Sequence, residues 1–314
     1  MKVENQTSNA PIPGAIEKTK VFITGATGYI GGSIAERLVA LGYEVTGLVR
    51  YADKAALLKE RGIQSVIGTL DDSEVLTLAA QAADIVIHTA NADHSGSVVT
   101  LVTALERSGK MLIHTSGSAI VADHADGEFA SAFPLTEDSY FEPVPSRRPR
   151  VDMNRYVRQA AIDKGIRSVV ICPTMIYGTG RGLQPDSDQI PKLTAVSKQV
   201  GAGVYLGKGL SHYSNVHIDD LVELYLLVME KAPGGSFFFA ENGHNSFKEI
   251  ALMISKNLGY GDKTFSMSVE EVTKNHGQEA RLGAASNSYV SAANARRLGW
   301  SPKAASLTEY FESL

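Results

Sequence analysis

Residues 20–31 read Lys20-Val-Phe-Ile-Thr-Gly25-Ala-Thr-Gly28-Tyr-Ile-Gly31, and this stretch decides the fold. The apolar run at 21–23 has the β-branched ends of a buried strand, and glycines follow it at once. Apolar residues then recur at helical spacing as far as Gly42, a typical helix stop. The segment from Tyr43 to Arg50 predicts a second strand. The order strand, glycine turn, helix, strand predicts an α/β protein with a doubly wound parallel sheet.

The spacing of the glycines suits a dinucleotide. Gly25 allows a tight turn, Gly28 lets backbone amides approach a pyrophosphate, and Gly31 lets the helix pack on the sheet. The helix N-terminus offers free N–H groups and a positive dipole end to phosphates. A plain strand–turn–helix is the alternative, but the flanking strand and helix are the context that this motif requires. The predicted cofactor residues here are Gly25, Thr27, Gly28, Tyr29 and Ile30.

The end of the second strand selects between the two nicotinamide cofactors. An acidic residue at this position binds the ribose 2′-OH of NAD, whereas an arginine suits the 2′-phosphate of NADP. The strand ends at Arg50, with Lys54 one turn further on, and Asp53 lies three residues beyond the expected acidic position. A solvated arginine at a strand end is the alternative interpretation. We expect NADP (NADPH) as the cofactor.

Composition limits the remaining possibilities. The 314 residues suffice for one large α/β domain and a smaller lobe, and 44% hydrophobic residues are ordinary for a globular protein. A net charge of −4 provides no basic field for nucleic acid or an anionic membrane. No apolar run approaches the ~20 residues of a membrane span. The single cysteine, Cys172, fits a reducing compartment, so we expect a cytoplasmic protein.

Further strands and helices follow in alternation. Residues 63–67 predict a third strand, and Leu70 in the next loop is the candidate adenine contact. Residues 84–90 predict a fourth strand, which ends at Thr89 and Ala90. Ligands of open α/β sheets lie outside the carboxyl ends of the strands, so both residues are expected beside the cofactor. Helices are predicted at 53–61, 73–82, 96–108 and 151–163.

Two more strand ends carry candidate site residues. The strand starting at Lys110 leads into Ser116 and Ser118, whose hydroxyls suit either a substrate carbonyl or the backbone of a turn. The strand at 167–173 ends in Pro173-Thr174-Met-Ile176-Tyr177, which leads back towards the cofactor. Pro173, Thr174 and Ile176 are therefore predicted to contact the cofactor, and Ser116, Ser118 and Tyr177 are the candidate catalytic residues.

The predicted domain organisation follows from these segments. We expect a flexible tail at 1–17, an NADP-binding domain at 18–180 to which 211–232 returns, and mainly a substrate lobe at 181–314. The irregular stretch at 119–149 is too long for an ordinary loop and is expected to cover the substrate cleft. The apolar segment 221–229 and the predicted helices 96–108 and 151–163 are candidate faces for a homodimer. Eight scattered histidines and one cysteine predict no metal site.

With these segments placed, the chain resembles the extended short-chain dehydrogenase/reductase superfamily, which includes NAD(P)-dependent epimerases, dehydratases and dihydroflavonol reductases. The resemblance covers roughly residues 18–310. The matching segments are Thr24-Gly-Ala-Thr-Gly-Tyr-Ile-Gly31, Asp84-Ile-Val-Ile-His-Thr-Ala90, Thr115-Ser-Gly-Ser118, Pro173-Thr-Met-Ile-Tyr-Gly178, Val216-His-Ile-Asp-Asp-Leu221 and Leu298-Gly-Trp-Ser-Pro302. The resemblance implies a Rossmann sheet with a smaller C-terminal α/β substrate lobe, a nicotinamide cofactor and a small-molecule substrate.

The chain departs from this superfamily at its catalytic motif. The resemblance implies a Tyr-x-x-x-Lys pair for proton transfer and a Ser or Thr for the substrate oxygen. No tyrosine between residues 140 and 165 is followed four residues later by lysine. Distance from Gly165 puts Arg150 near the lysine position, and a gapless match puts Gly117 at the Ser/Thr position. Arg150 is expected to hold a ribose or phosphate, since its pKa is too high for an acid.

Three functions fit this combination. The first is an NADP-dependent oxidoreductase, of carbonyl reductase or alcohol dehydrogenase type, in which Tyr177, Ser116, His94, His217 or water supplies the proton. The second is a nucleotide-sugar epimerase or dehydratase, against which the missing pair and Arg50 both count. The third is a regulatory protein, resembling the NmrA-like proteins, that binds NADP without turnover. A cofactor-independent isomerase or cyclase on the same scaffold is the remaining possibility.

Overall fold

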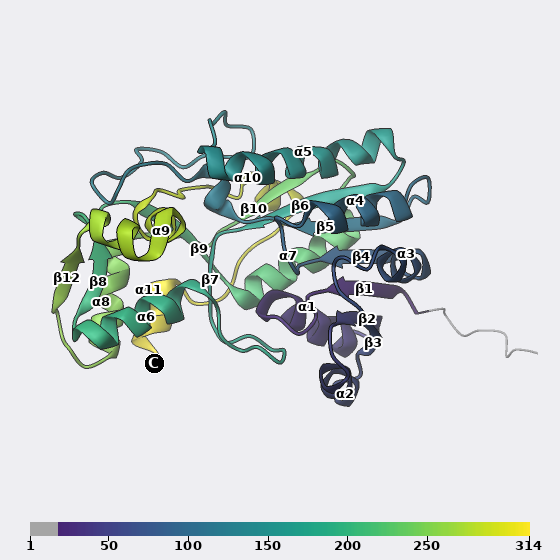
Figure 1. The fold of residues 1–314 in the computed structure, drawn as a ribbon, viewed down its shortest axis with the longest axis horizontal. Helices are drawn as coiled ribbons and strands as arrows, with labels where there is room; N and C mark the ends of the chain where they lie inside the picture. Colours follow the sequence, from purple (N-terminus) through teal and green to yellow (C-terminus); the bar gives the residue numbers. More distant parts are fainter. Residues whose placement is uncertain (1–17) are drawn as a thin grey trace, which may run out of the picture.

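A computed structural model describes residues 18–314 (Figure 1). The tail expected at residues 1–17 lies outside the described residues. The described chain forms a large parallel sheet flanked by helices, with a smaller lobe beside it built from C-terminal segments (Figure 1). This arrangement confirms the predicted α/β fold with a doubly wound parallel sheet.

The large sheet, as far as the structure describes the chain, has seven parallel strands in the order β10-β6-β5-β4-β1-β2-β3. The strands are β1 (Lys20–Thr24), β2 (Glu44–Val49), β3 (Gln64–Ile67), β4 (Ile85–His88), β5 (Met111–Thr115), β6 (Arg167–Pro173) and β10 (Phe237–Ala240). The chain leaves β1 towards β2 on one side and returns from β3 to β4 on the other. The strand order therefore reverses between β1 and β4, where open α/β sheets bind their ligands.

Helices cover both faces of this sheet (Figure 1). They are α1 (Tyr29–Ala40), α2 (Ala52–Glu60), α3 (Ser73–Ala82), α4 (Ser95–Ala104), α5 (Arg148–Asp163) and α7 (Ile218–Lys231). Helices α3, α4 and α5 pack in a row along one face, and α1 packs beside α7 on the other. The periodic apolar residues of α1 point into the core, where Ile34 and Leu38 are fully buried.

Two segments from late in the chain, helix α7 and strand β10, belong to the large domain. The apolar face of α7 lies in the same core as β1 and β5, and the Tyr225 hydroxyl lies 2.6 Å from Thr115 Oγ1. Strand β10 pairs with β6 in parallel, so Phe237–Ala240 also belongs to this sheet. The sequence predicts that the chain returns to the large domain only with residues 211–232. In the structure, β10 at 237–240 also belongs to the large sheet.

The smaller lobe contains two short sheets in the described part of the chain. Its strands are β7 (Met175–Tyr177), β8 (Gly203–Leu206), β9 (His212–His217), β11 (His244–Ser246) and β12 (Thr264–Met267), and its helices are α6 (Gln189–Val200), α8 (Phe247–Asn257), α9 (Val269–Ala285) and α11 (Leu307–Glu312). Helix α10 (Ala293–Leu298) instead packs against β10 and α7 of the large sheet. Strands β11, β9 and β7 form one sheet, and β12 pairs with β8. A capping box formed by Ser246 and Glu249 opens α8. Ser268 caps α9 through the Glu271 N–H.

The stretch 119–149 is tied to the C-terminal part of the chain. It follows a 3₁₀ turn at Ser118–Val121 and ends in another at Pro145–Arg147. Asp123 accepts hydrogen bonds from the backbone and side-chain N–H groups of Asn287, and Asp126 pairs with Arg281. Glu137 accepts from the backbone N–H groups of Phe239 and Asn294. These contacts fix the stretch across the junction between the large sheet and the smaller lobe.

Candidate functional site

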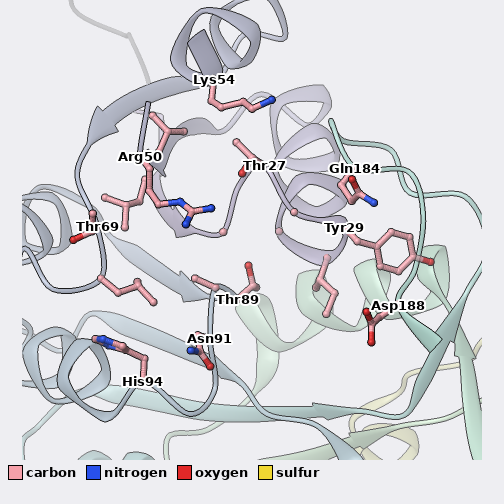
Figure 2. Close-up of a pocket in the computed structure, with 18 of the residues that line it drawn as sticks. Thr27, Tyr29, Arg50, Lys54, Thr69, Thr89, Asn91, His94, Gln184 and Asp188 are labelled. Carbon is pink, nitrogen blue, oxygen red and sulfur yellow. The ribbon is translucent and has the colours of Figure 1, made fainter. Parts of the chain in front are cut away.

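A cavity of about 940 Å³ lies at the carboxyl ends of β1, β2 and β4 (Figure 2). This is the position at which the strand order reverses. All the predicted cofactor residues except Arg150 and Pro173 line the cavity, namely Gly25, Thr27, Gly28, Tyr29, Ile30, Arg50, Leu70, Thr89, Ala90, Thr174 and Ile176. They come from loops far apart in the sequence, and the fold brings them together.

The glycines form a tight cradle at the bottom of the cavity. Gly25 has a φ of +81°, which favours glycine, and its carbonyl accepts from the Gly28 N–H at 2.9 Å. A Cβ placed on Gly31 would lie 2.4 Å from both Gly25 O and Thr89 Oγ1. Helix α1 can therefore approach β1 and β4 this closely only with glycine at position 31.

The start of α1 suits a phosphate group. Gly28 is the N-cap residue, and no side chain among the described residues caps the helix. The N–H groups of the first turn therefore remain available, beside a cavity wall that Tyr29 and Ile30 help to form. The cradle, the uncapped helix and the size of the cavity fit a dinucleotide.

A cationic edge borders the cavity at the end of β2. Figure 2 shows the Arg50 side chain directed into the cavity and Lys54 above it. The Arg50 guanidinium carbon lies 5.8 Å from the ring centroid of Tyr51. Within residues 18–314 no carboxylate lies within salt-bridge distance of Arg50. Its charge is therefore available to an anionic ligand.

Other wall residues were not predicted from the sequence. They include Thr69, Asn91, Gln184 and Asp188 (Figure 2), together with Asp186. His94, a possible proton donor from the sequence, also lines the cavity. His94 Nε2 lies 3.1 Å from Asp71 Oδ1, which links the loops after β3 and β4. The Tyr29 hydroxyl donates to the Gly178 carbonyl at 2.8 Å, and burial raises the pKa of Tyr29. The Gly180 N–H donates to the Pro185 carbonyl at 2.8 Å, which holds segment 184–189 in the wall, and sequence periodicity gives no signal for this contact.

The three candidate catalytic residues lie outside the cavity wall. Ser116 is buried and accepts a hydrogen bond from Asn154 Nδ2 at 2.9 Å. Ser118 is buried and accepts from Ser288 Oγ at 2.7 Å. The Tyr177 hydroxyl donates to the Ala305 carbonyl at 2.7 Å inside the core of the smaller lobe, and burial raises its pKa. The structure thus places Ser116 beside α5. The hydroxyls of Ser118 and Tyr177 are buried and hydrogen-bonded to other parts of the chain.

The two remaining cofactor candidates also stand away from the cavity. Arg150, in the first turn of α5, holds Asp93 through two parallel hydrogen bonds: Nε donates to Oδ1 at 2.7 Å and Nη2 donates to Oδ2. This pair lowers the pKa of Asp93. Pro173 is buried at the end of β6, beside Ala240 of β10.

A buried polar cluster lies between β4, β5 and the helices above them. The rings of His88 and His114 stack with their centroids 5.5 Å apart. His88 Nδ1 lies 2.6 Å from Thr24 Oγ1, whereas neither ring nitrogen of His114 has a partner in the described chain. Burial lowers the pKa of His88 to about 4 and that of His114 to about 3, so both are neutral at neutral pH. Burial also raises the pKa of Cys172 to about 12.

Residues 18–314 contain neither a candidate metal-binding cluster nor a candidate membrane-spanning helix. No group of three or more His, Cys, Asp or Glu side chains there could hold a metal ion. None of the described helices combines the length and the apolar character that crossing a membrane requires.

Known proteins resemble this chain over most of its length. The chain is 33% identical over 271 residues to the oxidase ucsJ of an Acremonium species, covering 75% of this chain and 78% of that protein. It is 27% identical over 248 residues to the 4-hydroxy-2-methyl-3-oxo-4-farnesyl-3,4-dihydroquinoline-1-oxide ketoreductase of Stigmatella aurantiaca, covering 71% and 68% of the two chains.

A solved structure shares the fold. The UDP-glucose 4-epimerase of Thermotoga maritima, crystallised with UDP-glucose, superimposes with a TM-score of 0.74 at 20% identity, covering 94% of this chain and 96% of that one. The model of the NAD-dependent epimerase/dehydratase family matches residues 21–238, more than half of the sequence. The chain therefore belongs to the NAD-dependent epimerase/dehydratase family.

Proposed function

We propose that this protein is an NADP-dependent oxidoreductase that acts on the carbonyl or alcohol group of a small organic substrate. The observation that carries the proposal is Arg50, a cation without a carboxylate partner in residues 18–314, directed into a dinucleotide-sized cavity. Membership of an NAD-dependent family and the similarity to a ketoreductase support the reaction class.

The cofactor choice follows from charge at the end of β2. Arg50 and Lys54 place two positive charges at the edge where the family fold binds the adenosine ribose. Asp53 starts α2 and does not line the cavity. A 2′-phosphate would be attracted to this edge, whereas a bare 2′-OH would leave Arg50 without an anionic partner.

The chain itself contributes binding and orientation. The glycine cradle and the free N–H groups of α1 would hold the pyrophosphate, and Thr174 and Ile176 would border the nicotinamide half. When bound, the nicotinamide supplies the hydride for reduction of a carbonyl group. Tyr177 is buried and its hydroxyl donates to the Ala305 carbonyl, so we do not propose it as the proton donor.

Titration of the purified protein with NADPH and NADH, followed by fluorescence, tests this proposal. Arg50→Ala is expected to weaken NADPH binding by about 1.5–3 kcal/mol, or roughly 10–150-fold, and to change NADH binding little. Arg155→Ala is the matched control, because Arg155 is an exposed residue of α5 paired with Asp152. Binding of neither cofactor by the wild type would refute the proposal, and equal NADPH binding by Arg50→Ala would refute the choice of NADP.

A regulatory protein that binds NADP without turnover is the second candidate. The observation that favours it is the absence of a Tyr-x-x-x-Lys pair on α5, where Arg150 and Asn154 face β5 instead. NADPH oxidation in the presence of ketones distinguishes the two candidates, because only the oxidoreductase consumes the cofactor.

A further inference from the structure

The first turn of α5 brings a cation to the ends of β4 and β5. Arg150 reaches Asp93 in the loop after β4, and its Nη1 atom lies 3.4 Å from where a Cβ of Gly117 would stand in the loop after β5. Asp93 is flanked in the chain by Asn91 and His94, which both line the dinucleotide cavity. The guanidinium therefore stands just outside that cavity, at the carboxyl ends of the strands, where an open α/β sheet binds its substrate.

Asp93 holds this guanidinium in place, but one of its N–H₂ groups has no acceptor among the described residues. Nε and Nη2 donate to the two oxygens of Asp93, while Nη1 donates to no acceptor among residues 18–314. The Arg150 side chain is 19% exposed and that of Asp93 is 55% exposed. A ligand can thus reach a fixed N–H pair whose orientation the bidentate contact already determines. Glycine at position 117 leaves the side of Nη1 free of a side chain.

Unsatisfied polar atoms lie beneath this position. Asn154 is four residues after Arg150 and so shares its helix face; its Nδ2 donates to Ser116 Oγ, but its Oδ1 has no partner in the described chain. Both ring nitrogens of buried His114 also lack partners there. Buried polar atoms are normally hydrogen-bonded, so this cluster keeps hydrogen-bonding capacity beneath Arg150 that a water molecule could satisfy.

We propose that Arg150 is a catalytic residue whose Nη1 group hydrogen-bonds the carbonyl oxygen of the substrate. This inference rests on the proposed function. When the carbonyl carbon gains the hydride that NADPH would supply on oxidation to NADP⁺, the electron pair of the C=O π bond moves to the oxygen, and the charge of Arg150 stabilises the alkoxide that forms. The alkoxide then takes a proton from water to give the alcohol, because a guanidinium does not release its own proton. Asp93 fixes the guanidinium without touching the substrate.

This role differs from the cofactor contact expected for Arg150 from the sequence. A ligand of the ribose or phosphate would contribute mainly to NADPH affinity. A residue that contacts the developing alkoxide contributes to kcat, because the charge that it stabilises exists only in the transition state. The two roles therefore predict opposite patterns of binding and turnover.

The test compares Arg150→Met, Arg150→Lys and the control Arg155→Met, whose exposed arginine on the same helix pairs with Asp152. NADPH affinity is measured by fluorescence, and reduction of acetophenone, isatin and menadione is measured by NADPH oxidation. Arg150→Met is expected to lower kcat by about 10²–10³-fold, the effect of losing one oxyanion donor, with NADPH affinity almost unchanged. Added guanidinium is expected to restore part of the activity, and the control to behave as the wild type.

A second readout does not depend on turnover. In the complex of the wild type with NADP⁺ and acetophenone, the C=O stretching frequency should fall, because a cation at the oxygen weakens the bond; Arg150→Met should abolish the shift. Unchanged kcat in Arg150→Met, or NADPH affinity that falls as much as kcat, would overturn the inference while leaving the proposed function intact. NADPH binding by a wild type that reduces none of the three ketones and shows no frequency shift would also overturn the inference, and it would favour the regulatory candidate over the oxidoreductase. Failure of the wild type to bind NADPH would instead refute the proposed function.

Discussion

Gly31 offers a sharp test of how the dinucleotide cradle is built. A Cβ at this position would lie 2.4 Å from the Gly25 carbonyl oxygen and from Thr89 Oγ1, whereas real contacts of a Cβ are at least 3.0 Å. Gly31→Ala must therefore move helix and loop apart by about 0.6 Å. The Thr89 hydroxyl must also rotate away, which breaks its 2.7 Å hydrogen bond to Thr24 O.

The expected cost combines three contributions. Overpacking costs about 1–3 kcal/mol, and loss of the Thr89 hydrogen bond costs about 1 kcal/mol. The better helix propensity of alanine returns up to about 1 kcal/mol. Gly31→Ala should thus lower the free energy of unfolding by about 1–4 kcal/mol, and it should also weaken NADPH binding because Gly25 carries the turn beneath the phosphate site.

Urea unfolding provides the assay, with circular dichroism and the fluorescence of the single tryptophan, Trp300, as probes. Gly283→Ala is the matched control: Gly283 lies in helix α9, and its Cβ would meet nothing within 4 Å. This control should gain roughly 0.5–1 kcal/mol, since alanine replaces glycine in an uncrowded helix. If Gly31→Ala were as stable as the control, the reasoning from close approach would be wrong.

Three further predictions concern stability. Ser246→Ala should cost about 1 kcal/mol in urea unfolding, because Ser246 and Glu249 form the capping box of α8; an unchanged midpoint would contradict this. Arg107→Gly should gain about 0.5–1 kcal/mol, because Arg107 has a φ of +60° and its side chain makes no hydrogen bond or ion pair within residues 18–314; a loss in the same assay would count against it. The pKa values of buried His88 and His114 are about 4 and about 3, below the ordinary 6.5. As the pH falls, the two histidines are therefore protonated in the unfolded chain before they are protonated in the folded protein. Stability present above pH 6.5 should fall on acidification towards pH 4 and 3, by up to about 1.4 kcal/mol per pH unit for each histidine, and urea titrations of His114→Phe should show a shallower fall.

The elements of the large sheet could be predicted because local pattern determines them. The helix predicted at 73–82 is α3, and the strand predicted at 167–173 is β6. Strand β7 was not recognised, because three residues after β6 become a strand only by pairing with β9, some forty positions later. Nor does the sequence pattern reveal helix α6, in which only Ile190 and Ser197 are buried and which is held by packing against β8 and α8.

The candidate site also has a part that local sequence predicts and a part that depends on contacts between distant segments. The glycine motif and Arg50 lie within one strand–helix–strand unit, so their spacing alone placed them in the cavity wall. Arg150 was recognised as unusual, but its partner Asp93 is 57 residues away and no sequence pattern links them. The hydroxyls of Ser118 and Tyr177 were available to many partners, and only the packing of distant segments decided that Ser288 and Ala305 would take them.

The pairing of β10 with β6 has a consequence for biosynthesis. Phe237, the first residue of β10, is added to the chain 64 residues after Pro173, the last residue of β6. At ordinary translation speeds this interval is roughly 3–13 s. During that time the emerging chain exposes the bare edge of β6, a surface that readily pairs with other chains. A trigger-factor-like chaperone, or a slow stretch of codons late in this interval, would have its greatest effect on the yield of this protein there.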